Sequence, residues 1–225
     1  MNNFSDQQII DSWRINARPW VTAVREGEIE SRLLVTNKAI IDSIIERNPK
    51  TVLDAGCGEG WLVRELSKLG VSSLGIDVVP ELIAFAQKEG VGRFKSLAYE
   101  NLSYDTLKQK FDLIVCNLSL LGNESVVQMF EQVPCLLNKA GAFIVQTIHP
   151  VKSCDNEKYV DGWREGSWGG FNEKFSNPAP WYFRTMETWK TLFINNGFTF
   201  TKILEPLNKK TDIAASVIFI GVKNS

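Results

Sequence analysis

Three alternate glycines follow a short apolar run in the segment Val52-Leu-Asp-Ala-Gly-Cys-Gly-Glu-Gly60, and an amphipathic stretch begins at Trp61. Glycine lets a ligand approach the backbone closely, and the start of a helix offers free N–H groups to it. The spacing is GxGxG rather than the GxGxxG of dinucleotide sites, and no P-loop lysine follows. The next apolar run ends at Asp77, whose carboxylate can accept both hydroxyls of a ribose. These features predict a nucleoside-binding loop at the end of a strand.

Short apolar runs alternate with helix-like stretches along most of the chain, which predicts βαβ units and therefore an α/β fold. We expect a mostly parallel sheet with helices on both faces, ending in an antiparallel strand pair. Two helices are expected upstream, over 7–15 and 29–47. The expected strands cover 51–55, 73–77, 93–97, 111–116, 142–148, 198–204 and 213–222, with a helix over 186–196 before the last two.

The length of 225 residues and the 44% of apolar residues fit a single domain over 1–225. We expect two elaborations on it, an N-terminal helical segment over 1–48 and a Gly-, Pro- and Trp-rich substrate lid over 149–185. The net charge of -1 argues against nucleic acid as a partner. No apolar stretch is long enough for a membrane span, so a cytoplasmic protein is expected. The four cysteines lie far apart without a CxxC pair, so no metal site is expected.

The motif Asp54-Ala-Gly-Cys-Gly-Glu-Gly60, followed by Gly75-Ile-Asp77, resembles the nucleoside-binding signature of class I S-adenosylmethionine-dependent methyltransferases. The resemblance implies a Rossmann-like sheet of seven strands, mostly parallel with an antiparallel last strand, and a methyltransferase that uses S-adenosyl-L-methionine and releases S-adenosyl-L-homocysteine. Many members carry an acidic residue after the third strand, where this chain has Leu97-Ala98-Tyr99. The cofactor-binding residues implied by the resemblance are Arg32, Asp54, Gly56, Cys57, Gly58, Asp77, Val78, Ala98, Asn117 and Leu118.

Arg32 enters that set because Glu30-Ser-Arg-Leu resembles the ubiquinone-biosynthesis O-methyltransferase branch, in which an arginine binds the cofactor carboxylate. A guanidinium matches a carboxylate with two parallel hydrogen bonds. A solvated arginine on a helix surface is the alternative interpretation. Trp13 and Trp20 precede it, in a stretch that either folds across the cofactor or packs as an ordinary amphipathic helix.

His149, the single histidine, follows the fifth expected strand, where ligands of open α/β sheets bind. Its imidazole is a candidate catalytic base for the acceptor, and a structural cap on a backbone group is the alternative. In the lid, aromatic rings suit a planar acceptor and arginines suit a carboxylate, although the tryptophans could instead pack the lid onto the sheet. The candidate substrate-binding residues are Trp163, Arg164, Trp168, Trp181, Tyr182 and Arg184.

Together these observations favour methyl transfer to a small molecule, with O-methylation of an aromatic or quinone-like acceptor as the first hypothesis. N-methylation of a small amine is the second. A regulator that binds S-adenosylmethionine or S-adenosylhomocysteine without catalysis is the third. A homodimer is left open, with the strand 213–222 as an antiparallel edge and the first helices as its contact surfaces.

Overall fold

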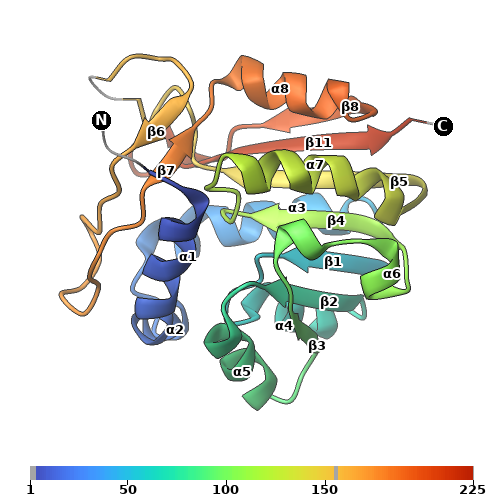
Figure 1. Ribbon diagram of the computed structural model, residues 1–225, viewed down its shortest axis with the longest axis horizontal. Coiled ribbons are helices and arrows are strands. Elements are labelled where there is room, and N and C mark those ends of the chain that lie inside the picture. The colour runs from blue at the N-terminus through green and yellow to red at the C-terminus, as the bar shows by residue number, and fades with distance from the viewer. Residues whose placement is uncertain (1–3, 155–156, 225) are drawn as a thin grey trace.

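The computed structural model describes residues 4–154 and 157–224, and its centre is a seven-stranded sheet in the order β3-β2-β1-β4-β5-β11-β8 (Figure 1). Two further strand pairs, β6 with β7 and β9 with β10, lie outside this sheet. The strands are β1 (Thr51–Ala55), β2 (Ser72–Asp77), β3 (Arg93–Ser96), β4 (Phe111–Asn117), β5 (Leu137–Thr147), β6 (Gly162–Arg164), β7 (Trp181–Phe183), β8 (Phe198–Leu204), β9 (Leu207–Asn208), β10 (Ile213–Ala214) and β11 (Val217–Lys223).

The pairing of the strands confirms the predicted sheet. Neighbours among β1 to β5 are parallel, whereas β11 is antiparallel to both β5 and β8. The expected strand 213–222 is divided, because Ile213 and Ala214 pair with β9 and only Val217 onwards enters the sheet. The expectation that this strand forms a free edge is wrong, since β11 lies between β5 and β8 and has hydrogen-bonded partners on both sides.

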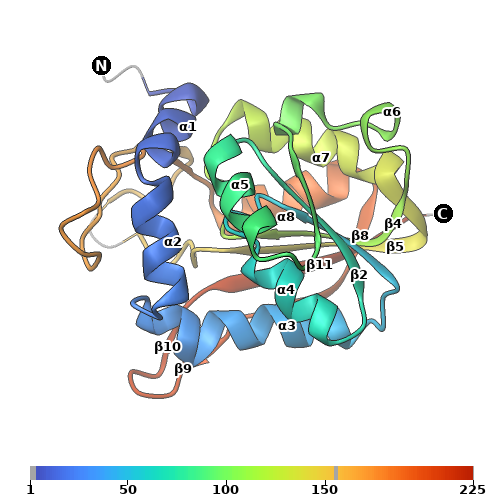
Figure 2. The ribbon, with the colours of Figure 1, turned by 90° about the horizontal axis from the view of Figure 1, so that it is seen from below.

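Helices cover both faces of the sheet (Figure 2). Phe130 of α7 and Phe193 of α8 pack with Phe143 and Phe219 on one face. Leucines and isoleucines of α3 and α4 form a second core on the opposite face. The helical segments are α1 (Asp6–Ile15), α2 (Ala17–Arg25), η1 (Arg32–Thr36), α3 (Asn37–Ile45), α4 (Trp61–Lys68), α5 (Pro80–Lys88), η2 (Tyr99–Asn101), α6 (Tyr104–Leu107), α7 (Glu124–Leu136) and α8 (Met186–Asn195).

The N-terminal segment differs from the prediction in two ways. An additional helix, α2, follows α1 after Asn16, and its Pro19 is tolerated because it lies in the first turn. The expected helix over 29–47 contains a π-helical turn, η1, before α3 begins. Both α1 and α2 lie at the end of the sheet where β1 and β4 end, as Figures 1 and 2 show.

The segment 149–185 carries the small β6–β7 hairpin and runs alongside α1 and α2 (Figures 1 and 2). The Asn16 side chain holds it there. Its Nδ2 donates to the carbonyl of Ser176 at 2.7 Å and its Oδ1 accepts from the N–H of Ser176 at 2.9 Å. Because Asn16 is fully buried, these bonds are shielded from water. The segment and the N-terminal helices therefore form one cap. Among the described residues, no helix is both long and apolar enough to span a bilayer.

Candidate functional site

A cavity of about 340 Å³ lies at the carboxyl ends of the central strands, beneath α1 and α2. The structure brings all ten residues that the sequence suggested for cofactor binding to its wall. Their binding role stays a prediction, but their convergence follows from the fold, because parallel strands end at one edge of the sheet. These residues are Arg32, Asp54, Gly56, Cys57, Gly58, Asp77, Val78, Ala98, Asn117 and Leu118.

The glycine loop can only be built with glycine at its first position. Gly56 has a φ of +79°, and a Cβ there would lie 2.3 Å from the Cβ of Ser119 and 2.6 Å from the hydroxyl of Tyr99. Both hydroxyls donate to the carbonyl of Ala55, at 2.8 Å from Ser119 and 3.2 Å from Tyr99. The end of β1 is therefore fixed by two cavity-lining side chains that the sequence analysis did not select.

The Asp77 carboxylate is buried at the end of β2 and faces the glycine loop. One oxygen accepts from the N–H of Gly58 and the other from the N–H of Val79, each at 2.9 Å. Burial raises the pKa of Asp77, while these backbone hydrogen bonds oppose the rise. A carboxylate oxygen has two lone pairs, so each keeps one acceptor site for a ligand hydroxyl. Asp77 can thus join the loop to β2 and still receive a diol.

Arg32 lies at the start of η1, and the structure contradicts the alternative of a solvated arginine. It is only 7% exposed, its Nη2 has no hydrogen-bond partner, and its guanidinium lies 4.8 Å from the ring centre of Trp61 and 5.4 Å from that of Trp20. Burial lowers its pKa to about 10, against the attraction of Glu59 and Asp54. The group therefore stays cationic at neutral pH, and the cavity contains a buried donor that needs an acceptor.

A buried acceptor without a partner lines the same cavity. The Oδ1 of Asn117, at the end of β4, has no hydrogen-bond donor. Asp54 is 2% exposed, and burial raises its pKa to about 7, with the charge of Asp77 adding to the rise and Arg32 opposing it. A ligand that carries both a carboxylate and an ammonium group would satisfy Arg32 and these oxygens together.

The fully buried Glu59 braces the glycine loop, a role that the sequence analysis missed. Its carboxylate pairs with Arg25 of α2 at 2.9 Å and with Arg64 of α4 at 2.7 Å. The loop is thereby tied to the cap above it and to the helix that follows it. The acidic residue between two motif glycines was visible in the sequence, but its partners lie in different elements.

Leu118 follows β4 and lines the cavity. Its φ of +55° is an uncommon backbone conformation for a residue other than glycine. Its N–H donates to the carbonyl of Gln146 at 2.8 Å, which holds this turn against β5. The remaining lining of the cavity comes largely from α1 and from the start of α7, elements for which the sequence carried no motif. These lining residues are Asp6, Gln7, Ile9, Ile10, Trp13, Leu121, Gly122, Glu124, Ser125 and Gln128.

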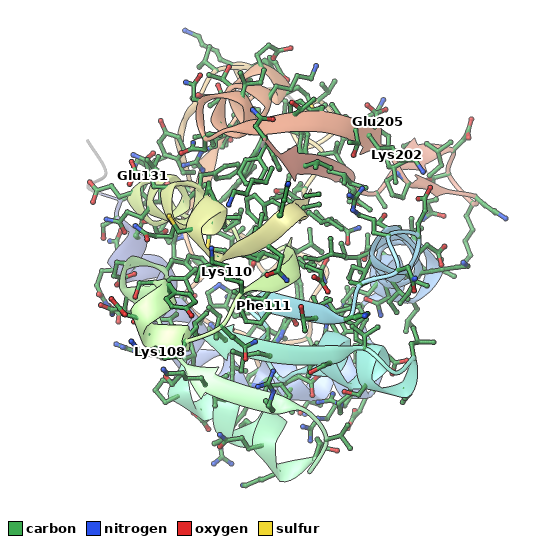
Figure 3. All side chains as sticks on the ribbon, turned by 90° about the vertical axis from the view of Figure 1, so that its right-hand side faces the viewer. Lys108, Lys110, Phe111, Glu131, Lys202 and Glu205 are labelled. Atoms are coloured by element: carbon green, nitrogen blue, oxygen red, sulfur yellow. The ribbon has the colours of Figure 1, made fainter. Side chains whose placement is uncertain are left out.

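The structure does not bring His149 to the cavity wall. Its ring is buried, Nδ1 accepts from the N–H of Lys152 at 3.4 Å, and Nε2 lies 3.6 Å from Oε1 of Glu205. Glu205 follows β8 at the sheet edge, where Figure 3 labels it beside Lys202. This placement favours the structural alternative for His149, so its catalytic role stays a prediction that the geometry does not support.

None of the six lid residues proposed for the substrate lines the cavity either. Trp163 packs edge-on against Tyr182, with ring centres 5.5 Å apart, and Trp181 packs against Phe183 in the same hairpin. Trp168 packs at 5.6 Å against Trp13, which itself lines the cavity. These lid tryptophans therefore pack within the lid and against the N-terminal helix α1, rather than onto the sheet as the packing alternative expected.

The two lid arginines form their contacts within the protein. Arg164 lies over the ring of Phe183 at 3.7 Å and donates to the carbonyl of Lys158. Arg184 donates to the carbonyls of Gly122 and Asn123, at 2.7 and 2.9 Å. Both guanidinium groups are buried, so the structure leaves neither of them facing the cavity as a binder of a substrate carboxylate.

Comparisons with known proteins agree with this geometry. A family model described as a methyltransferase domain matches residues 46–197, more than half of the chain. A ubiquinone biosynthesis O-methyltransferase from Glaesserella parasuis is 26% identical over 160 residues, which covers 66% of this chain and 66% of that relative. Relatives of the same name from Haemophilus ducreyi and Coxiella burnetii match over about half of their length, 46% and 48%.

Solved structures share the fold. A S-adenosylmethionine-dependent methyltransferase from Clostridium acetobutylicum superposes with a TM-score of 0.64 at 16% identity, covering 84% of this chain and 91% of that one. One from Mesorhizobium loti gives a TM-score of 0.60 at 21% identity, covering 77% of this chain and 90% of that one. With the glycine loop, Asp77 and the seven-stranded sheet in place, the chain belongs to the methyltransferase domain family and has the fold of the S-adenosylmethionine-dependent methyltransferases on which it superposes.

Proposed function

We propose that this protein transfers the methyl group of S-adenosylmethionine to a small-molecule acceptor within the cavity beneath α1 and α2. The buried guanidinium of Arg32, whose Nη2 has no hydrogen-bond partner, carries this proposal. A buried charged donor without a hydrogen-bond acceptor is costly, so it indicates a ligand that supplies one. The carboxylate of the cofactor's amino-acid end meets this need, and its ammonium group suits the free Oδ1 of Asn117 and the carboxylate of Asp54.

The other end of the cofactor fits the remaining residues of the motif. Asp77 accepts the ribose hydroxyls with the lone pairs that Gly58 and Val79 leave free. Val78 and Ala98 line the wall beyond it, where an adenine ring would lie, and Glu100 lines the same region. Glu100 is a candidate for the acidic residue that the third strand lacks at the position usual for the family.

When bound, S-adenosylmethionine supplies a methyl group on a cationic sulfur, and the transfer is an in-line displacement by the acceptor. The chain has to align the acceptor and exclude water. Asn117 and Leu118 end β4 beside the glycine loop, and α1 and Trp13 cover the cavity from above. No histidine lines the cavity among the described residues, so a general base for the acceptor would have to be one of the lining carboxylates, such as Asp54 or Glu124.

For the acceptor, O-methylation of an aromatic or quinone-like compound is the hypothesis we favour. The tryptophans Trp13 and Trp20 on the cavity wall and the relatives named ubiquinone biosynthesis O-methyltransferases support it. N-methylation of a small amine and a non-catalytic role in binding the cofactor or its product are the alternatives. A cytoplasmic location and a homodimer stay predictions.

The proposed function is tested by incubating the protein with methyl-labelled S-adenosylmethionine and panels of phenols, quinols and amines. Label in a phenol or quinol supports the favoured hypothesis, and label only in amines supports the second. Tight binding of S-adenosylhomocysteine with no labelled product in any panel supports the binding role. Arg32→Lys is the informative variant, because it keeps the charge but removes the two-donor geometry. Weaker cofactor binding in this variant is expected, and unchanged binding would refute the assignment of Arg32.

A further inference from the structure

One part of the cavity lies between α1 and the first turns of α7, and its lining differs from that of the glycine loop. We call this part the acceptor compartment. Apolar side chains of α1 and polar side chains of both helices line it. Its residues are Asp6, Gln7, Ile9, Ile10, Leu121, Gly122, Glu124, Ser125 and Gln128. The unpartnered Nη2 of the buried Arg32 in the same cavity shows that the cavity is built for a ligand.

The charges in this compartment are all negative. Asp6 and Glu124 line it, and Arg32 is the single cation among the described residues of the whole cavity wall. Arg184, whose charge interacts with that of Asp6, is bound to the carbonyls of Gly122 and Asn123 and does not line the cavity. Of the described residues that line the compartment, two are carboxylates and none is a cation, so an anionic ligand group there would meet charges of its own sign.

The start of α7, which could have bound an anion in the compartment, is already occupied by a carboxylate of the chain. The N-terminus of α7, a helix of 13 residues, would attract a carboxylate or phosphate through its free N–H groups. Asp6 accepts from the N–H of Asn123 at 2.8 Å and from the N–H of Ser125 at 2.7 Å. The carboxylate of α1 thus satisfies the helix end and brings its own charge into the compartment.

We propose that the acceptor compartment takes an acceptor that carries a protonated amine and discriminates against acceptors that carry a carboxylate. This inference rests on the proposed methyl transfer and adds a substrate class to it. An ammonium group would lie beside Asp6 and Glu124, and Trp13 on the wall of the same cavity adds an aromatic ring that can attract a cation. The negative charges of the compartment select which compound binds. Which of its atoms is methylated depends on the alignment of that atom with the methyl group of the cofactor.

The test uses three compounds that share a ring with two adjacent hydroxyls and differ in one substituent. They are dihydroxybenzylamine, dihydroxybenzyl alcohol and dihydroxybenzoate, titrated by calorimetry into the full chain saturated with S-adenosylhomocysteine. We expect the amine to bind at least about tenfold more tightly than the alcohol and the carboxylate at least about tenfold more weakly, the effect of one or two nearby charges at a partly exposed site.

Two variants locate the selectivity and a third is the control. Glu124→Gln removes an exposed charge at the compartment and should reduce the preference for the amine over the carboxylate at least about fivefold. Asp6→Asn should do the same while loosening α1, which is why Glu124→Gln is the cleaner variant. Glu131→Gln changes an exposed carboxylate on α7 that does not line the cavity, labelled in Figure 3, and should leave the preference unchanged.

The outcomes separate this inference from the proposed function. Equal binding of the three compounds, tighter binding of the carboxylate, or no binding of the amine overturns the inference, as does a preference that neither Glu124→Gln nor Asp6→Asn alters. If the amine binds most tightly and the carboxylate most weakly, but none of the three compounds is methylated by S-adenosylmethionine, the inference is supported and O-methylation of such phenols is overturned. Failure to bind S-adenosylhomocysteine overturns both.

Discussion

Replacing Asp54 by asparagine should stabilise the ligand-free protein above neutral pH while weakening cofactor binding. Burial, and then the charge of Asp77, raise the pKa of Asp54 from 3.8 to about 7, against the opposing effect of Arg32. The folded protein therefore keeps this proton up to about pH 7, whereas the unfolded chain releases it near about pH 4. Wild-type stability must fall as the pH rises between these two values, and the loss persists above them.

The size of the change in stability follows from the difference between the pKa values of Asp54 in the unfolded and the folded protein. The difference between 3.8 and about 7 corresponds to at most about 4 kcal/mol of unfolding free energy, because a tenfold change in an equilibrium constant is about 1.4 kcal/mol. Asparagine has nearly the same shape and cannot ionise. Allowing for relaxation and water entry, we expect Asp54→Asn to gain about 2 kcal/mol near pH 8, or about 4–8 °C in Tm for a chain of this size. The gain should vanish near about pH 4.

Thermal unfolding of the wild type and of Asp54→Asn between about pH 4 and about pH 8 measures this difference. Asp112→Asn is the matched control with the opposite sign. Burial acts to raise the pKa of Asp112, but hydrogen bonds from Asn138 and from the backbone of Lys50 and Thr51 outweigh it and lower the pKa. Its stabilising contribution is therefore present at neutral pH and is lost as the pH falls. A Tm difference for Asp54→Asn that is independent of pH, or that grows towards low pH, would refute the reasoning.

Three further predictions follow from the same contacts. Gly56→Ala places a Cβ 2.3 Å from Ser119 at a φ of +79°, so cofactor affinity by calorimetry should fall at least about tenfold and the Tm should drop; normal values of both would contradict the need for glycine there. Glu59→Gln removes a fully buried carboxylate and leaves Arg64 without an anion, while Arg25 keeps its ion pair with Glu89, and chemical denaturation should show a loss of about 2–4 kcal/mol. A loss below about 0.5 kcal/mol would mean that the ion pairs of Glu59 do not stabilise the fold. His149→Ala should reduce kcat less than about tenfold, because the ring does not line the cavity, and a fall of about 100-fold would restore its role as a base.

The cofactor half of the site was predictable because its determinants are local. Glycines after an apolar run and an acid at the end of the next run mark the ends of neighbouring strands, and parallel strands end together. The seven-stranded, mostly parallel sheet and its antiparallel last strand followed from the family resemblance, whereas the order of the strands was not predicted. Arg32 lines the cavity with the other predicted cofactor-binding residues, although its π-helical turn and its contacts with Trp20 and Trp61 were not visible in the sequence.

The acceptor half was not predictable because its determinants are distant in the chain. Arg184 looked available for a substrate, but the carbonyls that bind it belong to Gly122 and Asn123. The lid tryptophans looked like a binding surface, yet Trp168 packs against Trp13 of the N-terminal helix. A sequence shows that an arginine or a tryptophan is present, whereas its use depends on neighbours that only the fold supplies. The lining of α1 carried no motif at all.

The central claim is that the cavity holds S-adenosylmethionine through Asp77 and Arg32. Calorimetric titration of the full chain with S-adenosylmethionine and with S-adenosylhomocysteine, with NAD as the control nucleotide, tests it most directly. We expect micromolar affinity for the first two, no binding of NAD, and an affinity lowered by about 1–3 kcal/mol in Asp77→Ala, the range for losing charge-assisted hydrogen bonds. No binding of either methionine compound, or the same affinity in Asp77→Ala as in the wild type, would contradict it.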